Sequence, residues 1–180
     1  MGAFEDTAAI DEALTFLEED AYFFRSGYMR ERVARRLASS ALNAQHKARA
    51  REVVLSTVDG VRHCPQPGVG KLAGAVANNE LRRDLRARLH ADAAVARRAL
   101  RTIVNVRRPG LTPEDLAAAR ALVLAAAGGG HWLSPTVARQ AVYLWSREWE
   151  EELRSHLPYH GPDRAAAKRL LGTVKRRPAP

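Results

Sequence analysis

Cysteine, aromatic residues and long hydrophobic runs are all scarce in this sequence. A single cysteine, Cys64, leaves no disulfide framework within the chain. Aromatic residues make up 6% of the 180 residues, and β-branched residues are also sparse, which disfavours a β-sheet core. No apolar run approaches the roughly 20 residues that a helix needs to span a bilayer. These absences predict a soluble helical protein that does not enter the membrane.

Basic residues are missing from the first twenty positions, which instead contain seven acids. A secretory signal begins with a basic region and a transit peptide is rich in arginine, so neither pattern is present. Together with the lack of cysteine pairs, this predicts a cytoplasmic location.

Positive charge is concentrated in the middle of the chain. Residues 1–20 carry a net charge of −7, residues 21–110 carry +13, and residues 111–180 carry +3. The acidic first segment could lie against the basic middle, or the basic middle could meet an acidic partner. A third explanation is that arginine, a good helix former, merely covers solvated faces.

The clearest pattern lies between Asn78 and Gly110, where two helices are predicted around a tight turn. Leucines 81, 85 and 89 form one apolar face. Asp92 is a good N-cap for a second helix, whose apolar face contains Ala96, Leu100, Ile103 and Val104. The Arg-Arg-Pro-Gly sequence at 107–110 is expected to end that helix, because proline lacks an N–H group. Neither helix can bury its apolar face alone.

This short turn, the Asp cap and the following VARRAL sequence resemble the HEAT-type helical repeat over about thirty residues. The resemblance implies a superhelix that binds proteins or nucleic acid, and no particular activity. A second candidate hairpin occupies residues 26–58. We therefore expect an all-α fold without a sheet, built either from stacked antiparallel hairpins in a HEAT-like α-solenoid or as an irregular helical bundle. One domain is expected over residues 1–172, followed by a basic, disordered tail at 173–180.

Three helices are predicted before this unit. The first is capped by Thr7 and runs to about Asp20, the second is capped by Ser26, and the third is capped by Asn43 and runs to about Val58. The residues expected inside are Ile10, Leu14 and Leu17 in the first helix, Met29, Val33 and Leu37 in the second, and Ala50, Val54 and Val58 in the third. Tyr22, Phe23, Phe24 and Tyr28 are expected to hold the first two helices together, with base stacking as the alternative.

Glycine and proline punctuate residues 59–71, which we interpret as a surface loop. Its Gly-Val-Gly-Lys sequence resembles part of a phosphate-binding loop, but Pro65 and Leu72 stand where that motif needs glycine and Ser or Thr. His63 and Cys64 are adjacent, yet no second ligand pair has zinc-like spacing. We expect neither a metal nor a cofactor.

Two further helices are predicted after Gly110. Thr112 and Pro113 begin one that is apolar nearly all round through residue 127, which makes it our candidate for the central helix. The other is predicted as one long helix over residues 134–157, with Trp145 and Trp149 on a single stripe. That stripe is expected in the core; the alternative is a docking face through which the chain forms a homo-oligomer.

No nucleophile with a base, no carboxylate pair and no ligand cluster can be identified by spacing, so the sequence leans away from an enzyme without excluding a site assembled in the fold. The expected function is a protein–protein interaction adaptor with a basic helical surface. Its partner would be an acidic protein surface or, alternatively, a nucleic-acid backbone. The arginines expected to form this surface are Arg32, Arg36, Arg82, Arg83, Arg86, Arg97, Arg98 and Arg101.

Overall fold

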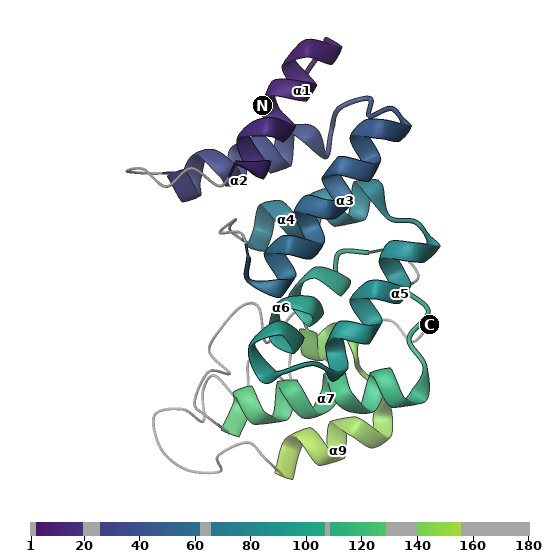
Figure 1. Cartoon of the computed structure of the whole chain (residues 1–180). Helices are drawn as coiled ribbons and strands as arrows, with labels where there is room; N and C mark the ends of the chain where they lie inside the picture. The colour runs from purple at the N-terminus through teal and green to yellow at the C-terminus, as the bar shows by residue number, and fades with distance from the viewer. Residues whose placement is uncertain (1–2, 20–25, 62–65, 107–108, 129–139, 156–180) are drawn as a thin grey trace. The chain divides into compact units, whose positions relative to one another are not determined.

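The computed structural model describes residues 3–19, 26–61, 66–106, 109–128 and 140–155 (Figure 1). These residues form helices and connecting turns, and no strand occurs among them. The helices belong to two compact units, Met1–Gly110 and Leu111–Pro180. The expectation of a single domain over residues 1–172 stays a prediction, and the tail at 173–180 lies outside the described residues. Several other features of the sequence also lie there, namely Tyr22, Phe23, Phe24, His63 and Cys64.

The first unit begins with α1 (Thr7–Glu18), which packs against α2 (Ser26–Leu37) and α3 (Ala44–Asp59). Its N-cap is Asp6, whose carboxylate accepts a hydrogen bond from the backbone N–H of Ala9 at 2.7 Å. The prediction that Thr7 is the cap was therefore wrong by one residue. The predicted apolar face is confirmed, because Ile10, Leu14 and Leu17 are buried.

Helix α2 has Ser26, which was predicted as its cap, as its first residue; the prediction of its buried face was right for Leu37 and wrong for Met29. The structure buries Ser26, Arg30, Ala34 and Leu37, whereas Met29 is 41% exposed. The reason is tertiary, because a glycine of α4 approaches α2 at Ala34, where only a small side chain fits. Tyr28 was expected to join the first two helices and is instead 59% exposed.

Helix α3 follows its sequence signals closely. Asn43 caps its first turn by accepting a hydrogen bond from the backbone N–H of His46 at 2.8 Å. Ala50, Val54 and Val58 are buried as predicted. The helix ends at Gly60, which adopts a left-handed conformation with φ of 83°. Glycine suits this position because the left-handed region strains residues that carry a Cβ atom.

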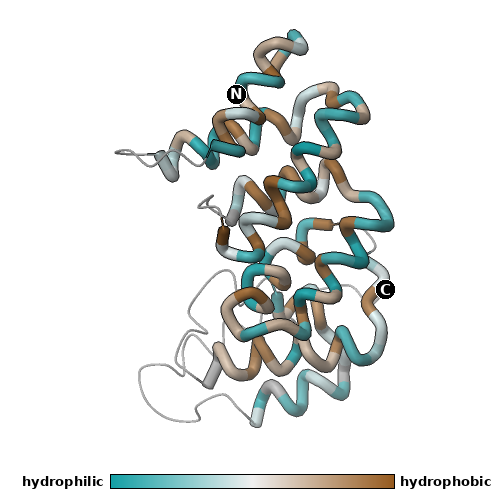
Figure 2. The backbone as a smooth tube through the Cα atoms, in the orientation of Figure 1, coloured by the Kyte–Doolittle hydropathy of each residue, from teal (hydrophilic) through white to brown (hydrophobic). Residues whose placement is uncertain are grey.

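Helix α4 (Gln66–Val76) corrects the interpretation of residues 59–71 as a surface loop. Val69, Leu72 and Ala73 are fully buried, and α4 packs against α2, α3 and α6 (Ala93–Ile103). Its glycines allow close approach rather than a turn: a Cβ atom on Gly74 would lie 2.7 Å from the backbone oxygen of Asn105. Figure 2 shows hydrophobic and hydrophilic residues alternating along the helices of this unit, as amphipathic helices require.

The predicted hairpin between Asn78 and Gly110 is present as α5 (Asn79–Ala87), a short 3₁₀ turn η1 (Arg88–His90) and α6. The leucines at 81, 85 and 89 are buried, and so are Ala96, Leu100 and Ile103. Asp92 caps α6 by accepting hydrogen bonds from the N–H groups of Ala94 and Val95 at 2.9 and 3.1 Å. Helix α6 ends at Ile103, four residues before the Arg-Arg-Pro-Gly sequence that was expected to stop it.

The second unit contains α7 (Pro113–Gly128) and α9 (Arg147–Ser155). Thr112 and Asp115 form a reciprocal cap at the start of α7, with hydrogen bonds of 3.0 and 3.2 Å. The prediction that α7 is enclosed on most sides was wrong: among its residues of described burial, 113–126, Asp115, Ala119 and Val123 are buried, whereas Ala117, Ala121 and Ala125 are exposed. Small alanines tolerate exposure at little cost, so an alanine-rich helix needs no surrounding neighbours.

A helix break at Trp145 and Ser146 corrects the single helix predicted over residues 134–157, of which residues 134–139 and 156–157 lie outside the described part. Ser146 starts α9 anew by accepting a hydrogen bond from the backbone N–H of Trp149 at 3.3 Å. Trp149 is buried, with 2% exposure, whereas Trp145 is only half-buried. Because the helix is interrupted between them, the two tryptophans do not belong to one continuous helical stripe.

Candidate functional site

One arginine of the basic middle binds the acidic first helix. The guanidinium of Arg49 on α3 donates hydrogen bonds to both carboxylate oxygens of Glu18, at 2.8 and 2.7 Å, and to Asp11 at 2.7 Å. A further bond of 3.0 Å reaches the hydroxyl of Thr15. Hydrogen bonding to Glu18 is the main cause that raises the pKa of Arg49. The acidic first helix therefore does lie against the basic middle, and part of the charge asymmetry is resolved within the chain.

Two more arginines hold the C-terminal end of α3. Arg88 forms a two-pronged ion pair with Asp59, with nitrogen–oxygen distances of 2.6 and 2.7 Å. Arg98 donates from Nε to the backbone oxygen of Val58 at 2.6 Å. Cationic donors are favoured at this end of a helix because its last carbonyl groups lack partners. Arg98 was predicted to bind a partner, and the structure gives it this internal contact.

Three other predicted arginines also contact their own chain. Arg36 lies 4.1 Å from the ring centroid of Phe4. Arg82 donates to the side chain of Asn79 at 3.0 Å. Arg86 donates to the backbone oxygen of Gly110. All three side chains are half-buried. Part of each side chain therefore contacts its own chain and is not available to a partner.

The remaining four predicted arginines are exposed: Arg32, Arg83, Arg97 and Arg101. The side chain of Arg83 is 69% exposed and lies 3.5 Å from Asp84. Arg97 and Arg101 stand one turn apart on α6, so they share one of its faces. Arg32 belongs to α2, where its guanidinium lies 5.6 Å from the ring centroid of Tyr28.

The structure thus separates the predicted arginines into two sets. Arg32 and Arg36 are on α2, which packs against α1 and α4, while the others are on α5 and α6. Helix α4 contacts both α2 and α6, and therefore lies between these sets. Arg83, Arg97 and Arg101 are the exposed members of the predicted set on α5 and α6.

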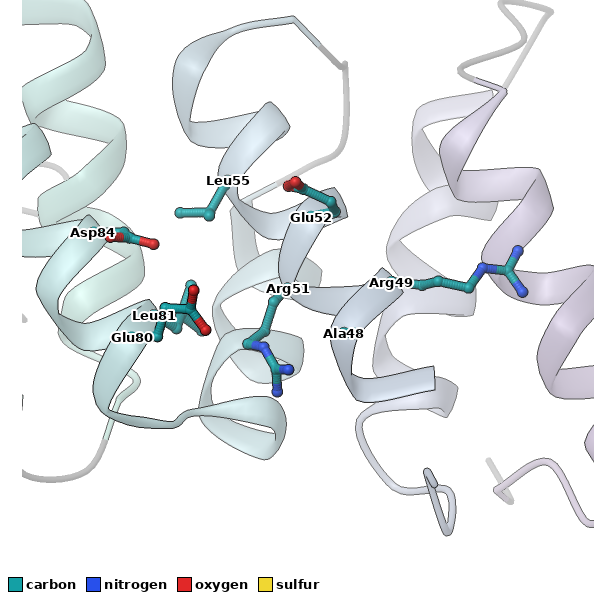
Figure 3. A pocket seen from close by; sticks show the side chains of 8 residues that line it. All are labelled: Ala48, Arg49, Arg51, Glu52, Leu55, Glu80, Leu81 and Asp84. Atoms are coloured by element: carbon teal, nitrogen blue, oxygen red, sulfur yellow. The ribbon is translucent and has the colours of Figure 1, made fainter. Parts of the chain in front are cut away.

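A groove between α3 and α5 was missed by the sequence reading (Figure 3). Its volume is about 420 Å³, and its walls come from Ala48, Arg49, Arg51, Glu52 and Leu55 of α3 and from Glu80, Leu81 and Asp84 of α5. The residues from α3 recur at the helical period and could have been recognised as a face with mixed character. That α5 would stand opposite this face could be known only from the fold.

In the second unit, Trp149 is in the core as predicted, whereas Trp145 is only half-buried. Trp149 is buried, and the guanidinium of Arg120 lies 5.5 Å from its ring centroid while donating to the backbone oxygen of Leu144 at 3.2 and 3.1 Å. Trp145 donates from Nε1 to Glu150 at 3.1 Å. Trp149 is therefore a core residue, so a homo-oligomer formed through this helix would have to use other side chains.

No group of three or more His, Cys, Asp or Glu residues suited to a metal ion occurs in the part of the chain that the structure describes. Within the same residues, no helix has the length and apolarity to cross a bilayer. The chain matches no protein-family model, no curated protein and no solved structure.

Proposed function

We propose that this chain is a non-catalytic protein-binding module, and that exposed arginines of α5 and α6 contact an acidic surface on its partner. The observation that carries the proposal is that some arginines bind within the chain while others are exposed. Arg49, Arg88 and Arg98 make close contacts within the chain, whereas Arg83, Arg97 and Arg101 extend from the hairpin into solvent. Guanidinium groups pair well with carboxylates and phosphates because their forked donors match two oxygens at once.

An acidic protein is favoured over nucleic acid by the contact between α1 and α3. There, Arg49 binds two carboxylates that lie seven residues apart on one helix, Asp11 and Glu18. This intramolecular pair is an example of an acidic helix lying on a basic one. Arg97 and Arg101 stand one turn apart on α6, which suits carboxylates about one turn apart on a partner helix.

We also propose that the first unit is a HEAT-like stack of three hairpins. The support comes from its pattern of contacts: α1 with α2, α3 with α4 and α5 with α6 form pairs, and each first helix contacts the first helix of the next pair. The second helices are joined in the same way, α2 to α4 and α4 to α6. An experimental structure in which α1, α3 and α5 do not share one side of this unit would overturn the stacked arrangement.

The function can be tested with two charge-matched variants. Replacing Arg97 and Arg101 by glutamate changes the proposed surface, and replacing Lys47 and Lys71 by glutamate makes the same change in net charge at exposed positions on α3 and α4. Each protein is titrated with an acidic helical peptide and with a random-sequence DNA duplex at two salt concentrations. We expect the arginine variant alone to lose at least tenfold in affinity for the peptide.

Two results would contradict the proposal. Equal peptide affinity in both variants would mean that the arginines only cover a solvated surface. Tighter binding of the duplex than of the peptide, with a steep loss of affinity as salt rises, would identify phosphate-backbone binding as the function instead.

A further inference from the structure

The groove between α3 and α5 combines an aliphatic floor with charged walls. Ala48, Leu55 and Leu81 supply the apolar surface, and Glu52, Glu80 and Asp84 supply carboxylates. Figure 3 shows the two glutamates and the aspartate on both sides of the gap, with Leu55 directed across it toward α5. The groove's volume of about 420 Å³ falls in the range of roughly 300–1,000 Å³ that small-molecule sites have, so it has room for one long side chain.

Two arginines near these carboxylates, Arg49 and Arg88, form their ion pairs with acids outside the groove lining. Arg49 belongs to the lining, but its guanidinium points away from the gap toward α1, where it is bound by Asp11 and Glu18 (Figure 3). The guanidinium of Arg88 is paired with Asp59, and its Nη1 also donates to the backbone oxygen of Asp84 at 3.1 Å, so Arg88 lies close to Asp84 without bonding to a carboxylate of the groove. Arg51 is the remaining cation of the lining, which also contains three acids, Glu52, Glu80 and Asp84.

Glu80 is the most available of these acids. It is exposed, and its carboxylate makes no hydrogen bond or ion pair with any residue that the structure describes. Asp84, by contrast, lies 3.5 Å from the Nε of Arg83. The groove thus carries local negative charge in a protein whose formal net charge is +9. The low-dielectric walls of a cleft strengthen the electric field of the charges that line it.

We propose that this groove binds a lysine- or arginine-bearing segment of a partner protein. The methylene stem of the inserted side chain would lie on Leu55, which is half-buried, and its charged end would reach Glu80 and Asp84. Lysine and arginine combine these two characters in one side chain, which matches an aliphatic floor with an anionic wall. A phosphate or an acidic peptide is disfavoured here because it would meet three carboxylates.

This site is distinct from the arginine surface on α5 and α6, and the two proposals can fail separately. The probe is a fluorescein-labelled hexalysine peptide, titrated into the full-length protein at low salt and followed by fluorescence anisotropy. A protein of strong positive charge repels such a peptide in general, so measurable binding reports a local negative site. We expect binding, and no loss of it in the Arg97→Glu, Arg101→Glu protein.

Variants in which acids are replaced by their neutral amides show where the peptide binds. Replacing Glu80 by glutamine and Asp84 by asparagine should weaken hexalysine binding at least fivefold, whereas Glu5→Gln with Glu12→Gln, which removes two exposed acids near α1, should change it less than twofold. If the double variant loses helix content, Glu80→Gln alone gives the same test without disturbing Asp84. Absence of binding to the wild-type protein, or equal binding to both sets of variants, would overturn the proposal.

Discussion

At the scale of single residues, the same amino acid serves different purposes according to its position in the fold. Arg88 and Arg98 complete the end of α3, Arg49 fixes α1, and Arg97 and Arg101 stay in solvent. Their helical positions were predictable from the sequence, but their contacts were not. Arginine has a long side chain, so the neighbour that it reaches is set by how the helices pack.

Trp149→Ala should destabilise the protein far more than Trp145→Ala. Trp149 is almost fully buried, and truncating a buried aromatic costs roughly 3–5 kcal/mol through lost contacts and the cavity that remains. Trp145 is half-buried, so less of its surface is removed from water. Urea unfolding curves of the two variants test the difference, and equal losses of unfolding free energy would contradict the assignment of Trp149 to the core.

Asp92 should make stability depend on acid pH. Hydrogen bonds from the N–H groups of Val95 and Ala94, with help from Arg98 and Arg97, lower the pKa of this carboxyl below its ordinary value of 3.8. The ionised cap therefore stabilises the folded state above that value, and the contribution is lost as pH falls through the lowered pKa.

Asp92→Asn keeps a side-chain acceptor but removes the charge. The wild-type protein should melt at a higher temperature than this variant near neutral pH, and the gap should narrow as the pH approaches about 2, well below the ordinary carboxyl pKa. Melting curves followed by circular dichroism at several pH values measure it. A gap that is constant over the whole range would show that the charge of Asp92 contributes nothing.

At the scale of secondary structure elements, the largest departure from the sequence reading is α4. Glycines at 68, 70 and 74 ordinarily argue against a helix, because glycine is entropically costly there. In this fold their missing Cβ atoms let α4 approach α2 and the turn after α6. This close packing cannot be predicted from the pattern of a single sequence, because it depends on the backbone of a segment distant along the chain.

Gly74→Ala should destabilise the protein even though alanine is the better helix former. The added Cβ atom would meet the backbone oxygen of Asn105 at 2.7 Å, and overpacking of this kind typically costs about 1–3 kcal/mol. Ala75→Ser, at the adjacent exposed position, is the control and should stay within about half a kcal/mol. A Gly74→Ala protein as stable as the wild type would mean that α4 has room to move aside.

Arg49→Gln should loosen α1 without unfolding the rest of the first unit. The substitution removes the bonds to Glu18 and Asp11 that join α1 to α3. We expect amide hydrogens of residues 10–18 to exchange several-fold faster, with α4 and α6 unchanged. Arg51→Gln is the matched control, because Arg51 is on the same helix and its side chain does not point toward α1 (Figure 3). Equal exchange rates in both variants would contradict a special role for Arg49.

At the scale of the whole molecule, the helices belong to two compact units, Met1–Gly110 and Leu111–Pro180. Residues 1–110 contain α1 to α6 and an apolar core centred on α4, with Val69, Leu72 and Ala73 fully buried. A fragment ending at Gly110 should therefore fold on its own.

Circular dichroism and denaturant titration of that fragment test this prediction. We expect helical content comparable with that of the same segment in the whole chain, and a single cooperative unfolding transition. A fragment with little helix or a broad, non-cooperative transition would show that the first unit needs the remainder of the chain.

The sequence by itself determined the helical class, the caps at Asn43, Asp92 and Thr112, and the leucine face of α5. These features depend on local physics: an N-cap bonds within its own first turn, and the helical period decides which residues share a face. They could be read without knowing any neighbour.

Tertiary structure alone decided which face of α2 is buried, that a glycine-rich segment forms α4, and that α3 and α5 enclose a groove. In each case the energy depends on a surface contributed by another part of the chain. Ala34 is buried in place of Met29 because Gly68 lies against it. Likewise, the acids of α3 and α5 are charged surface residues in the sequence and become the two walls of one groove only when the helices are set side by side.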